Sequence, residues 1–481
     1  MSLRRVLFLL VTLVAFSSSP RAAEIDIGSR LEPFVDDFLI DQMTADLGLK
    51  LHSPRPAKEV FVFDEPWEGH TAAYVSIIQD GDIYRMYYRG GLGEPGYLSA
   101  CVCYAESRDG IHWKKPELNL VEYSGSVKNN IIWAGVGSPC SIGVFRDTNP
   151  DCNPAHRYKA ISSDGYNKPV YAFGSRDAIH WELILEEPVI NEYRGAAAAY
   201  DGQFASWWDE ARNRYVMYHR AWYRPAEGKV RSIATRTSSD FVSWTPLELL
   251  DFGDAQFEHL YTNAAQPYFR APHIFLIFPK RFLPDRKLIA EAPYGGISDA
   301  VFASSRDGVY FDRRFMEAFI RPGRNRLNWY SRTNMVATAL LPTAPDEISL
   351  YVSQAYNHPT AHLRRYVIRT DGFVSVHAGY EGGELLTKPL RFTGVRLVIN
   401  CATSAAGSVR VEITDPNGKA ISGFAADDCD EIYRDEIERV VSWKKGPDVG
   451  ALSGQPVRLR FLLKDADLYS LRFGDEAEIQ R

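Results

Sequence analysis

The chain has 481 residues, of which 45% are hydrophobic, 13% aromatic and 24% charged. These proportions exclude a disordered, collagen-like or coiled-coil protein, and the length allows two or more domains. The net charge is −6, and it becomes −9 (−6 − 3) without residues 1–23, which carry three arginines and no acid. An acidic chain without basic runs is a poor partner for nucleic acid or for an anionic membrane surface.

The first 23 residues have the features of a secretion signal. Arg4 and Arg5 precede an apolar run over residues 6–16, and Ala22-Ala23 before Glu24 resembles a small-residue cleavage site. The run is too short to span a bilayer, and no later segment is apolar enough to do so. We therefore expect an exported protein, secreted or periplasmic, without membrane insertion after cleavage.

A seven-residue motif recurs along the chain. It reads Ser-Arg-Asp-Gly-Ile-His-Trp at 107–113, with related forms at 175–181, 238–244 and 305–311 and a degenerate form at 369–373. The motif aspartates are 63 to 68 residues apart, and a β-branched and aromatic segment precedes each motif, at 84–88, 158–161, 215–218, 274–278 and 348–352. A period of about 65 residues suits four short strands, so the repeats predict a five-bladed β-propeller.

The motif residues have a predicted structural role. A short Asp or Ser side chain accepts hydrogen bonds from nearby backbone N–H groups and fixes a turn, and the aromatic residue that follows packs between blades. Four acidic residues are therefore expected to be structural rather than catalytic: Asp109, Asp177, Asp240 and Asp307.

The two ends of the chain differ from the repeats. Residues 24–60 form an extended segment that either closes the propeller ring or lies against the C-terminal domain. The propeller is expected over residues 61–384. Alternating hydrophobic and polar residues and the hairpin turn Asp-Pro-Asn-Gly at 415–418 predict a β-sandwich over 385–481. The whole protein is thus expected to be all-β.

The six cysteines do not make a disulfide scaffold in an exported chain of this size. Cys140 with Cys152, and Cys401 with Cys429, can form disulfides, and buried free thiols are an equal alternative for each pair.

The predicted architecture resembles the glycoside hydrolases of families 32 and 43. The hairpin at 77–88 is similar to the hairpin of their first blade, and segments 31–37 and 85–90 look like an exported bacterial group described as glycosyl hydrolase family 32-like. The resemblance implies hydrolysis of glycosidic bonds. The family 32 nucleophile motif would fall on residues 70–74, where this chain has no carboxylate, so fructan or sucrose cleavage is not expected.

Candidate site residues follow from position in the propeller. Ligands bind where the innermost strands enter the central funnel, about 13 to 17 residues before each second strand. Glu68, Asp201, Glu258 and Arg332 occupy such positions in blades one, three, four and five. Glycoside cleavage needs two carboxyl groups, and we predict Asp201 and Glu258 as the pair with Glu68 as a third acid. The predicted substrate-binding residues are His70, Trp67, Gln203, His259, Tyr261, Asn263, Trp329 and Arg332.

Three function classes remain open at this point. The first is a glycoside hydrolase acting on an oligo- or polysaccharide, preferred over a phosphorylase because the funnel positions offer a single obvious arginine. The second is a non-catalytic carbohydrate-binding propeller, which would keep the aromatic residues without needing the acids. The third is a structural interaction module. No zinc spacing, P-loop or dinucleotide fingerprint is present, so no metal or cofactor is expected.

Overall fold

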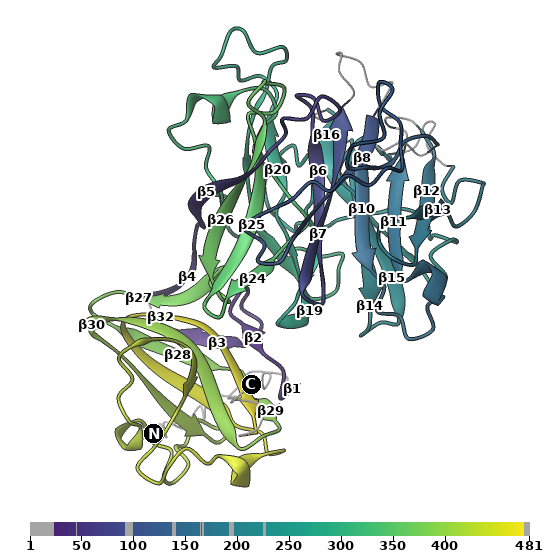
Figure 1. The fold of residues 1–481 in the computed structure, drawn as a ribbon. Coiled ribbons are helices and arrows are strands. Elements are labelled where there is room, and N and C mark those ends of the chain that lie inside the picture. The colour runs from purple at the N-terminus through teal and green to yellow at the C-terminus, as the bar shows by residue number, and fades with distance from the viewer. Residues whose placement is uncertain are drawn as a thin grey trace, which may run out of the picture.

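The computed structural model describes residues 24–475 apart from 45, 92–99, 137–140, 164, 166–167, 192–196 and 225–227. The predicted signal peptide therefore lies outside the described residues. The described chain is almost entirely β, and it forms a propeller joined to a C-terminal domain (Figure 1). Within these residues, no helix has the length and apolar character to cross a membrane.

The first three blades each have four antiparallel strands. Blade one contains β6 (Ala73–Asp80), β7 (Ile83–Gly91), β8 (Ala100–Ser107) and β9 (Ile131–Trp133). Blade two contains β10 (Ser141–Arg146), β11 (Tyr158–Ser163), β12 (Val170–Ser175) and β13 (Trp181–Leu183). Blade three contains β14 (Ala205–Asp209), β15 (Arg214–Tyr223), β16 (Val230–Ser238) and β17 (Glu248–Leu249).

The last two blades are less regular. Blade four contains β18 (Gln266–Tyr268), β19 (Ala271–Ile277) and β22 (Ala303–Ser305), with β20 (Lys280–Leu283) and β21 (Ile297–Ala300) paired as a ribbon between β19 and β22 in the chain. Blade five contains β23 (Met335–Val336), β25 (Glu347–Gln354) and β26 (His362–Arg369), and β24 (Leu341–Ala344) also pairs with β25. The five-bladed propeller is confirmed, and each predicted aromatic segment lies on the second strand of its blade.

The N-terminal segment takes part in both domains. Its strand β5 (Arg55–Val62) pairs with β26 and completes blade five, so the ring is closed by a strand that precedes blade one. Its strands β3 (Ile40–Met43) and β4 (Leu47–Leu51) pair with strands of the C-terminal domain.

The repeated motif forms the turn that the sequence predicts. In blade two, Oδ1 of Asp177 accepts hydrogen bonds from the backbone N–H groups of Ile179 at 3.0 Å and His180 at 2.8 Å. The same bonds recur in blades one, three and four. The aromatic residue that follows contacts the neighbouring blade: the rings of Trp181 and Tyr87 are 5.9 Å apart, edge to face.

A second interaction links each of several motifs to the preceding blade. The hydroxyl of Tyr87 in blade one donates to the carbonyl of Ala178 in the motif of blade two at 3.0 Å. The hydroxyl of Tyr218 in blade three donates to the carbonyl of Gly308 in blade four at 2.7 Å, and the same bond joins blade five to blade one. The motif therefore serves as an inter-blade contact as well as a turn.

We expect Asp177→Ala to lower the free energy of unfolding by about 1–2 kcal/mol, because it removes the bonds that fix this turn. Partial burial acts to raise the pKa of Asp177, but hydrogen bonds from His180 and Ile179 outweigh it and lower the pKa to about 2. Urea denaturation monitored by tryptophan fluorescence measures the loss, with a substitution at the exposed neighbour, Arg176→Ala, as control. A loss of activity at unchanged stability would contradict the structural role.

The C-terminal domain is built on one eight-stranded sheet. It contains β2 (Glu32–Pro33), β3, β4, β27 (Val374–Ala378), β28 (Gly383–Thr387), β30 (Arg396–Thr414), β31 (Asp435–Val440) and β32 (Arg458–Gly474). A parallel pair, β1 (Ile25–Gly28) with β29 (Leu390–Phe392), adds to it. The long strands β30 and β32 pair along most of their length through two irregularities, so the hydrogen bonds of this domain run through one continuous sheet. The β-sandwich arrangement of the domain stays a prediction.

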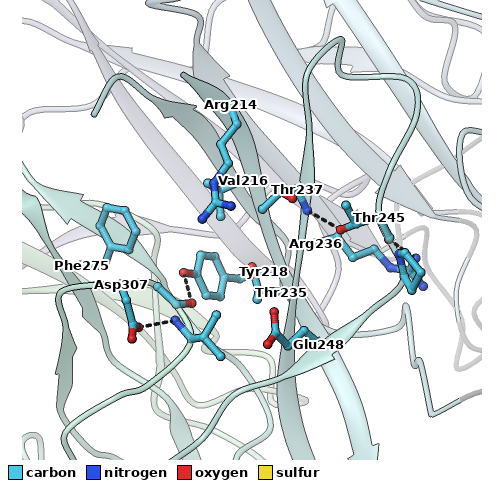
Figure 2. A pocket seen from close by; sticks show the side chains of 13 residues that line it. Arg214, Val216, Tyr218, Thr235, Arg236, Thr237, Thr245, Glu248, Phe275 and Asp307 are labelled. Carbon is cyan, nitrogen blue, oxygen red and sulfur yellow. Dashed lines mark hydrogen bonds between the residues drawn. The ribbon is translucent and has the colours of Figure 1, made fainter. Parts of the chain in front are cut away.

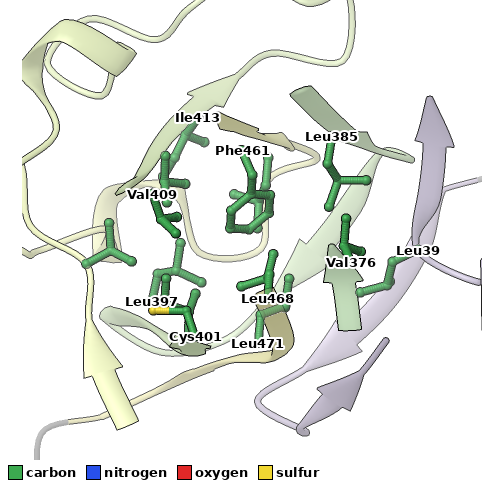
Figure 3. Packing of buried hydrophobic residues seen from close by; sticks show 14 of the residues in the cluster. Leu39, Val376, Leu385, Leu397, Cys401, Val409, Ile413, Phe461, Leu468 and Leu471 are labelled. Carbon is green, nitrogen blue, oxygen red and sulfur yellow. The ribbon is translucent and has the colours of Figure 1, made fainter. Parts of the chain in front are cut away.

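One apolar core fills this domain. Figure 3 shows Leu39, Val376, Leu397, Val409 and Phe461 among the side chains that meet there. Because β27 pairs with β32 and β4, the strand pairing of the C-terminal domain begins near residue 374, earlier than the expected boundary at 385.

The cysteines of the described chain are free thiols. Cys401 and Cys429 are both buried in the C-terminal core and are not bonded to each other. Burial raises the pKa of Cys401 to about 12, which makes its thiol unreactive. Cys152 is also free, and Cys140 lies outside the described residues.

Ion pairs join the two domains. Arg306, from the motif of blade four, donates to Glu32 at 2.9 Å and to Asp36 at 2.7 and 3.1 Å. The degenerate fifth motif also joins the two domains, through a hydrogen bond instead of an ion pair. The buried Asp371 accepts this hydrogen bond from Ser470 of β32 at 2.8 Å. The motif has thus been adapted in two blades to hold the C-terminal domain.

Candidate active site

The innermost strands of the propeller are β6, β10, β14, β18 and β23. The first four contact one another in this order, β23 contacts β6, and blade four reaches β23 through β21. The segments that lead into these strands carry the residues predicted from position. Three of these residues, Asp201, Tyr261 and Arg332, come together in one group of side chains. We call this group the Tyr261 cluster, and it consists of Asp201, Tyr261, Arg332, Arg89, Arg220, Arg231 and Lys280.

The ring of Tyr261 is the centre of the cluster. The guanidinium carbon of Arg220 lies 4.5 Å from the ring centroid, that of Arg231 lies 5.4 Å away, and Nζ of Lys280 lies 4.3 Å away. Burial raises the pKa of Tyr261, with Arg220 acting in the opposite direction, so its hydroxyl stays protonated at neutral pH. One aromatic ring therefore has three cations around it.

Asp201 supplies the negative charge of the cluster. Its Oδ1 accepts a hydrogen bond from Nη1 of Arg220 at 2.6 Å, and 21% of its side chain is exposed to solvent. Its backbone carbonyl accepts a hydrogen bond from the Tyr74 hydroxyl at 3.1 Å. A carboxylate that is held in place and still reached by solvent can accept a proton or a hydrogen bond from a ligand.

Lys280 is buried among the arginines. Only 1% of the residue is exposed, and Nζ donates to the backbone carbonyl of Arg332 at 3.1 Å. Burial, followed by the charges of Arg332, Arg220 and Arg231, lowers the pKa of Lys280 well below its usual range. Burial and the charge of Arg220 also lower the pKa of Arg231. Perturbed groups that gather in this way are typical of functional sites.

Arg89 extends the cluster toward blade one. Its guanidinium lies 4.7 Å from the ring of Tyr74 and donates to the hydroxyl of Tyr356 at 2.9 Å. Arg332 lies beside another aromatic residue, with its guanidinium 4.7 Å from the ring of Tyr294. Aromatic rings that flank a polar centre are suited to stack on the faces of a sugar.

The backbone around the cluster is strained. Residues in or beside the innermost strands and just after β25 have φ in the left-handed region, namely Tyr74 (54°), Ala264 (42°), Arg332 (54°), Asn334 (58°), Ala355 (52°) and Asn357 (65°). Such conformations cost about 1–3 kcal/mol each and concentrate at active sites and ligand clamps. Their gathering here is a second indication of function.

The structure places Glu258 outside this cluster. Its carboxylate forms ion pairs with Arg281 at 3.2 Å and with the buried Arg313. Arg281 follows Lys280 on β20, and successive side chains of a strand point to opposite faces. Glu258 therefore contacts the face of β20 that points away from Tyr261, and no described contact joins it to Asp201.

Glu68 is also held elsewhere. It is completely buried, and its carboxylate accepts hydrogen bonds from the Tyr88 hydroxyl at 2.5 Å and from Nζ of Lys115 at 2.7 Å. Burial raises the pKa of Glu68, against the effect of Lys115. The neighbouring Trp67 donates from its indole to Asn130 at 2.6 Å, so both residues help to anchor the segment before β6 within blade one.

Two predicted substrate-binding residues connect inner strands instead of facing solvent. Gln203 and Asn263 are buried. Asn263 donates to the carbonyl of Gln203 at 2.8 Å, and the Gln203 amide donates to the carbonyl of Val336 at 3.1 Å. These bonds fix blades three, four and five relative to one another.

The remaining predicted residues lie at the rim. His259 Nδ1 is 3.2 Å from Nη1 of Arg231, and burial together with this charge lowers the pKa of His259. His70 is exposed, and its backbone carbonyl accepts a hydrogen bond from the backbone N–H of Asn357 at 2.8 Å. The indole of Trp329 donates to the carbonyl of Gly323 at 2.9 Å.

Four cations of the cluster were not predicted from position. Arg89, Arg220 and Lys280 follow the ends of the aromatic segments of blades one, three and four, five or six residues after each segment begins. A basic residue at this repeated place is therefore a signal that sequence reasoning can use. Arg231 is at the start of the third strand of blade three, where no repeat marks it.

A cavity of about 210 Å³ lies elsewhere, between blades three and four (Figure 2). Arg214, Thr235 and Glu248 line it on one side, and Asp307 of the motif lines it on the other. Asp307 is already committed to the backbone N–H groups of its own turn. The cavity is smaller than the roughly 300–1,000 Å³ of ordinary ligand pockets and contains no residue of the Tyr261 cluster.

Among the residues that the structure describes, no three His, Cys, Asp or Glu side chains are grouped so that they can hold a metal ion. The fold and the cluster together define a five-bladed β-propeller with a cationic, aromatic centre.

No family model matches the sequence. Two proteins of Mycobacterium tuberculosis are 40% identical to parts of the chain. They are Uncharacterized protein MT1551 of strain CDC 1551 / Oshkosh, over 136 residues (26% of this chain and 43% of that protein), and Uncharacterized protein Rv1502 of strain ATCC 25618 / H37Rv, over 150 residues (30% and 45%). The chain thus spans less than half the length of these curated relatives.

Solved structures show a distant likeness. A structure described as a glycoside hydrolase has a TM-score of 0.45 at 14% identity, covering 66% of this chain and 92% of that protein. An N-acetylgalactosamine deacetylase from F. plautii in complex with blood group B trisaccharide has a TM-score of 0.45 at 12% identity, covering 68% and 97%. A member of the GH130 family of mannoside phosphorylases and glycoside hydrolases has a TM-score of 0.40 at 16% identity, covering 70% and 96%.

Proposed function

We propose that this protein is an exported carbohydrate-active enzyme that cleaves glycosidic bonds at the Tyr261 cluster. The observation that carries the proposal is the convergence of a solvent-reached carboxylate, Asp201, with aromatic rings and cations at the strained segments leading into the innermost strands. Asp201 would either attack the anomeric carbon or activate a water molecule for that attack. Tyr261 and its aromatic neighbours would hold the sugar.

A second candidate function is carbohydrate binding without cleavage. It is favoured by a specific observation: the described part of the cluster contains one carboxylate, whereas glycoside cleavage ordinarily uses a second carboxyl group as the proton donor. The cluster also bears on the choice between hydrolysis and phosphorolysis. Hydrolysis was preferred because the funnel positions offered a single arginine. Four arginines belong to the cluster, so this argument against phosphorolysis is weaker.

Asp201→Asn is expected to reduce kcat/KM by about a thousandfold or more, because the variant keeps the shape of the side chain but cannot act as base or nucleophile. The measurement is product release from a panel of plant and algal polysaccharides and aryl glycosides. Glu258→Gln is the matched control, since it makes the same chemical change outside the cluster and should lower the melting temperature while retaining activity.

Three results would change this assignment. Loss of activity in both variants, with stability retained, would restore Asp201 and Glu258 as the catalytic pair. Full activity in Asp201→Asn would remove the Tyr261 cluster from catalysis. Absence of product release across the panel, with binding retained, would establish the carbohydrate-binding alternative.

A further inference from the structure

The charge of the Tyr261 cluster is unbalanced. Among the described residues, five cations are gathered with a single carboxylate, and Asp201 is paired with Arg220. Arg231 has the neutral His259 as its side-chain hydrogen-bond partner, Lys280 donates to a backbone carbonyl, and Arg332 lies against an aromatic ring. None of these last three cations has a carboxylate partner in the described chain.

Burial makes this imbalance costly. Arg220 is 3% exposed and Lys280 is 1% exposed, so water screens their charges poorly. The buried Nε atoms of Arg220, Arg231 and Arg332 have no hydrogen-bond partner among the described residues. Buried donors and like charges without compensation destabilise a fold, so a cluster of this kind is best explained by a ligand that compensates it.

We infer that the Tyr261 cluster binds an oxyanion, namely a carboxylate, sulfate or phosphate group that belongs to the carbohydrate or is bound beside it. Guanidinium groups form paired hydrogen bonds with the oxygen atoms of these groups, and a lysine adds a point charge. A neutral sugar would leave the excess positive charge uncompensated. The statement that the oxyanion accompanies a carbohydrate rests on the proposed function. The statement that an oxyanion binds here rests only on the uncompensated charges of the cluster.

The test is calorimetric titration at constant ionic strength with sodium sulfate, sodium phosphate and glucuronate, using glucose and sodium chloride as reference ligands. We expect binding of at least one oxyanion probe and no comparable binding of glucose or chloride. Arg231→Gln and Lys280→Met should each weaken that binding about tenfold or more, because each removes a charged donor. Arg214→Gln is the matched control, because Arg214 lies on β15 like Arg220 but lines the separate cavity between blades three and four.

A second measurement separates ligand binding from a purely structural role. If the cations are present for a ligand, Arg231→Gln and Lys280→Met should raise the melting temperature of the ligand-free protein, since each relieves repulsion. A lower melting temperature in both variants together with unchanged anion binding would show that they are structural. Equal heats for sulfate and chloride would overturn the inference.

Calorimetric titration with oligosaccharides distinguishes the two sources of the oxyanion, a substituent of the carbohydrate or a free anion bound beside it. An anionic substituent predicts that a uronate or sulfated oligosaccharide binds more tightly than its neutral counterpart and competes with phosphate. A free anion predicts that phosphate and a neutral oligosaccharide strengthen each other's binding. Binding needs no turnover, so the oxyanion site can be established even if no cleavage is found. Cleavage of neutral substrates without anion binding would contradict the oxyanion site alone.

Discussion

Arg306→Ala is expected to lower the free energy of unfolding by about 3–5 kcal/mol, because it removes one of the cations that compensate a buried charge. The Glu32 side chain is completely buried and accepts a hydrogen bond from Arg306 at 2.9 Å. Burial acts to raise the pKa of Glu32, but the hydrogen bond from His273 and the charge of Arg306 outweigh it and lower the pKa to about 2. Arg306 also binds Asp36, so one substitution breaks both contacts with the N-terminal segment.

The repeat provides the matched control for this substitution. Arg176 occupies the same motif position in blade two but is exposed, so Arg176→Ala should change stability by less than about 0.5 kcal/mol. Because the pKa of Glu32 is lowered in the folded state, its contribution is present above about pH 4.5 and is lost as the pH falls toward 2. The difference between wild type and Arg306→Ala should therefore narrow in acid. Equal urea midpoints for the two alanine variants at pH 7 would contradict this role.

The second large effect is expected from His219, which makes the propeller sensitive to acid. His219 lies in the interior of β15, with Nδ1 donating to the carbonyl of Arg220 at 2.9 Å and its ring 5.1 Å from that of Tyr200. Burial lowers the pKa of His219 to about 3. In the unfolded chain this histidine is protonated near pH 6.5. Between pH 6.5 and 3 the unfolded state therefore binds more protons than the folded state. Stability should therefore fall by about 3–5 kcal/mol from pH 6.5 toward pH 3.

His219→Gln removes this titration and keeps a polar side chain at the position. We expect its free energy of unfolding, measured by urea denaturation between pH 7 and 4, to fall less steeply with acid than that of wild type. His70→Gln, a substitution at an exposed histidine, should follow the wild-type curve. Parallel curves for wild type and His219→Gln would show that another group controls the acid response.

The propeller was predictable because its repeat is local. The bonds of Asp177 to Ile179 and His180 lie within one turn, so the sequence itself displays the motif once per blade. The sequence left open whether residues 24–60 close the propeller ring or lie against the C-terminal domain, and the structure shows both. The individual strand partners were not predictable, because they come from distant parts of the chain and no local pattern marks them. For the same reason the C-terminal domain was expected to begin at 385, although β27 already pairs with β32.

The site was predictable in part. Counting back from the second strands identified Asp201, Tyr261 and Arg332, which the structure brings together. Counting back did not identify Arg220 and Lys280, because these residues follow the aromatic segments of their blades and the counted positions precede those segments. Spacing also cannot fix the direction of a side chain at the end of a loop, which is why the position of Glu258 in the sequence did not reveal its contacts with Arg281 and Arg313.

The closure of blade five by β5 has a consequence for the order of events during synthesis. Val62 pairs with His362, which the ribosome adds 300 residues later (362 − 62), and β3 and β4 await partners that emerge later still. The first strands made are therefore the last to find their partners. Such high contact order predicts slow folding, with an unpaired strand exposed throughout translation. A chaperone that binds residues 40–62 during synthesis should therefore increase the yield of folded protein more than a chaperone that binds any single blade.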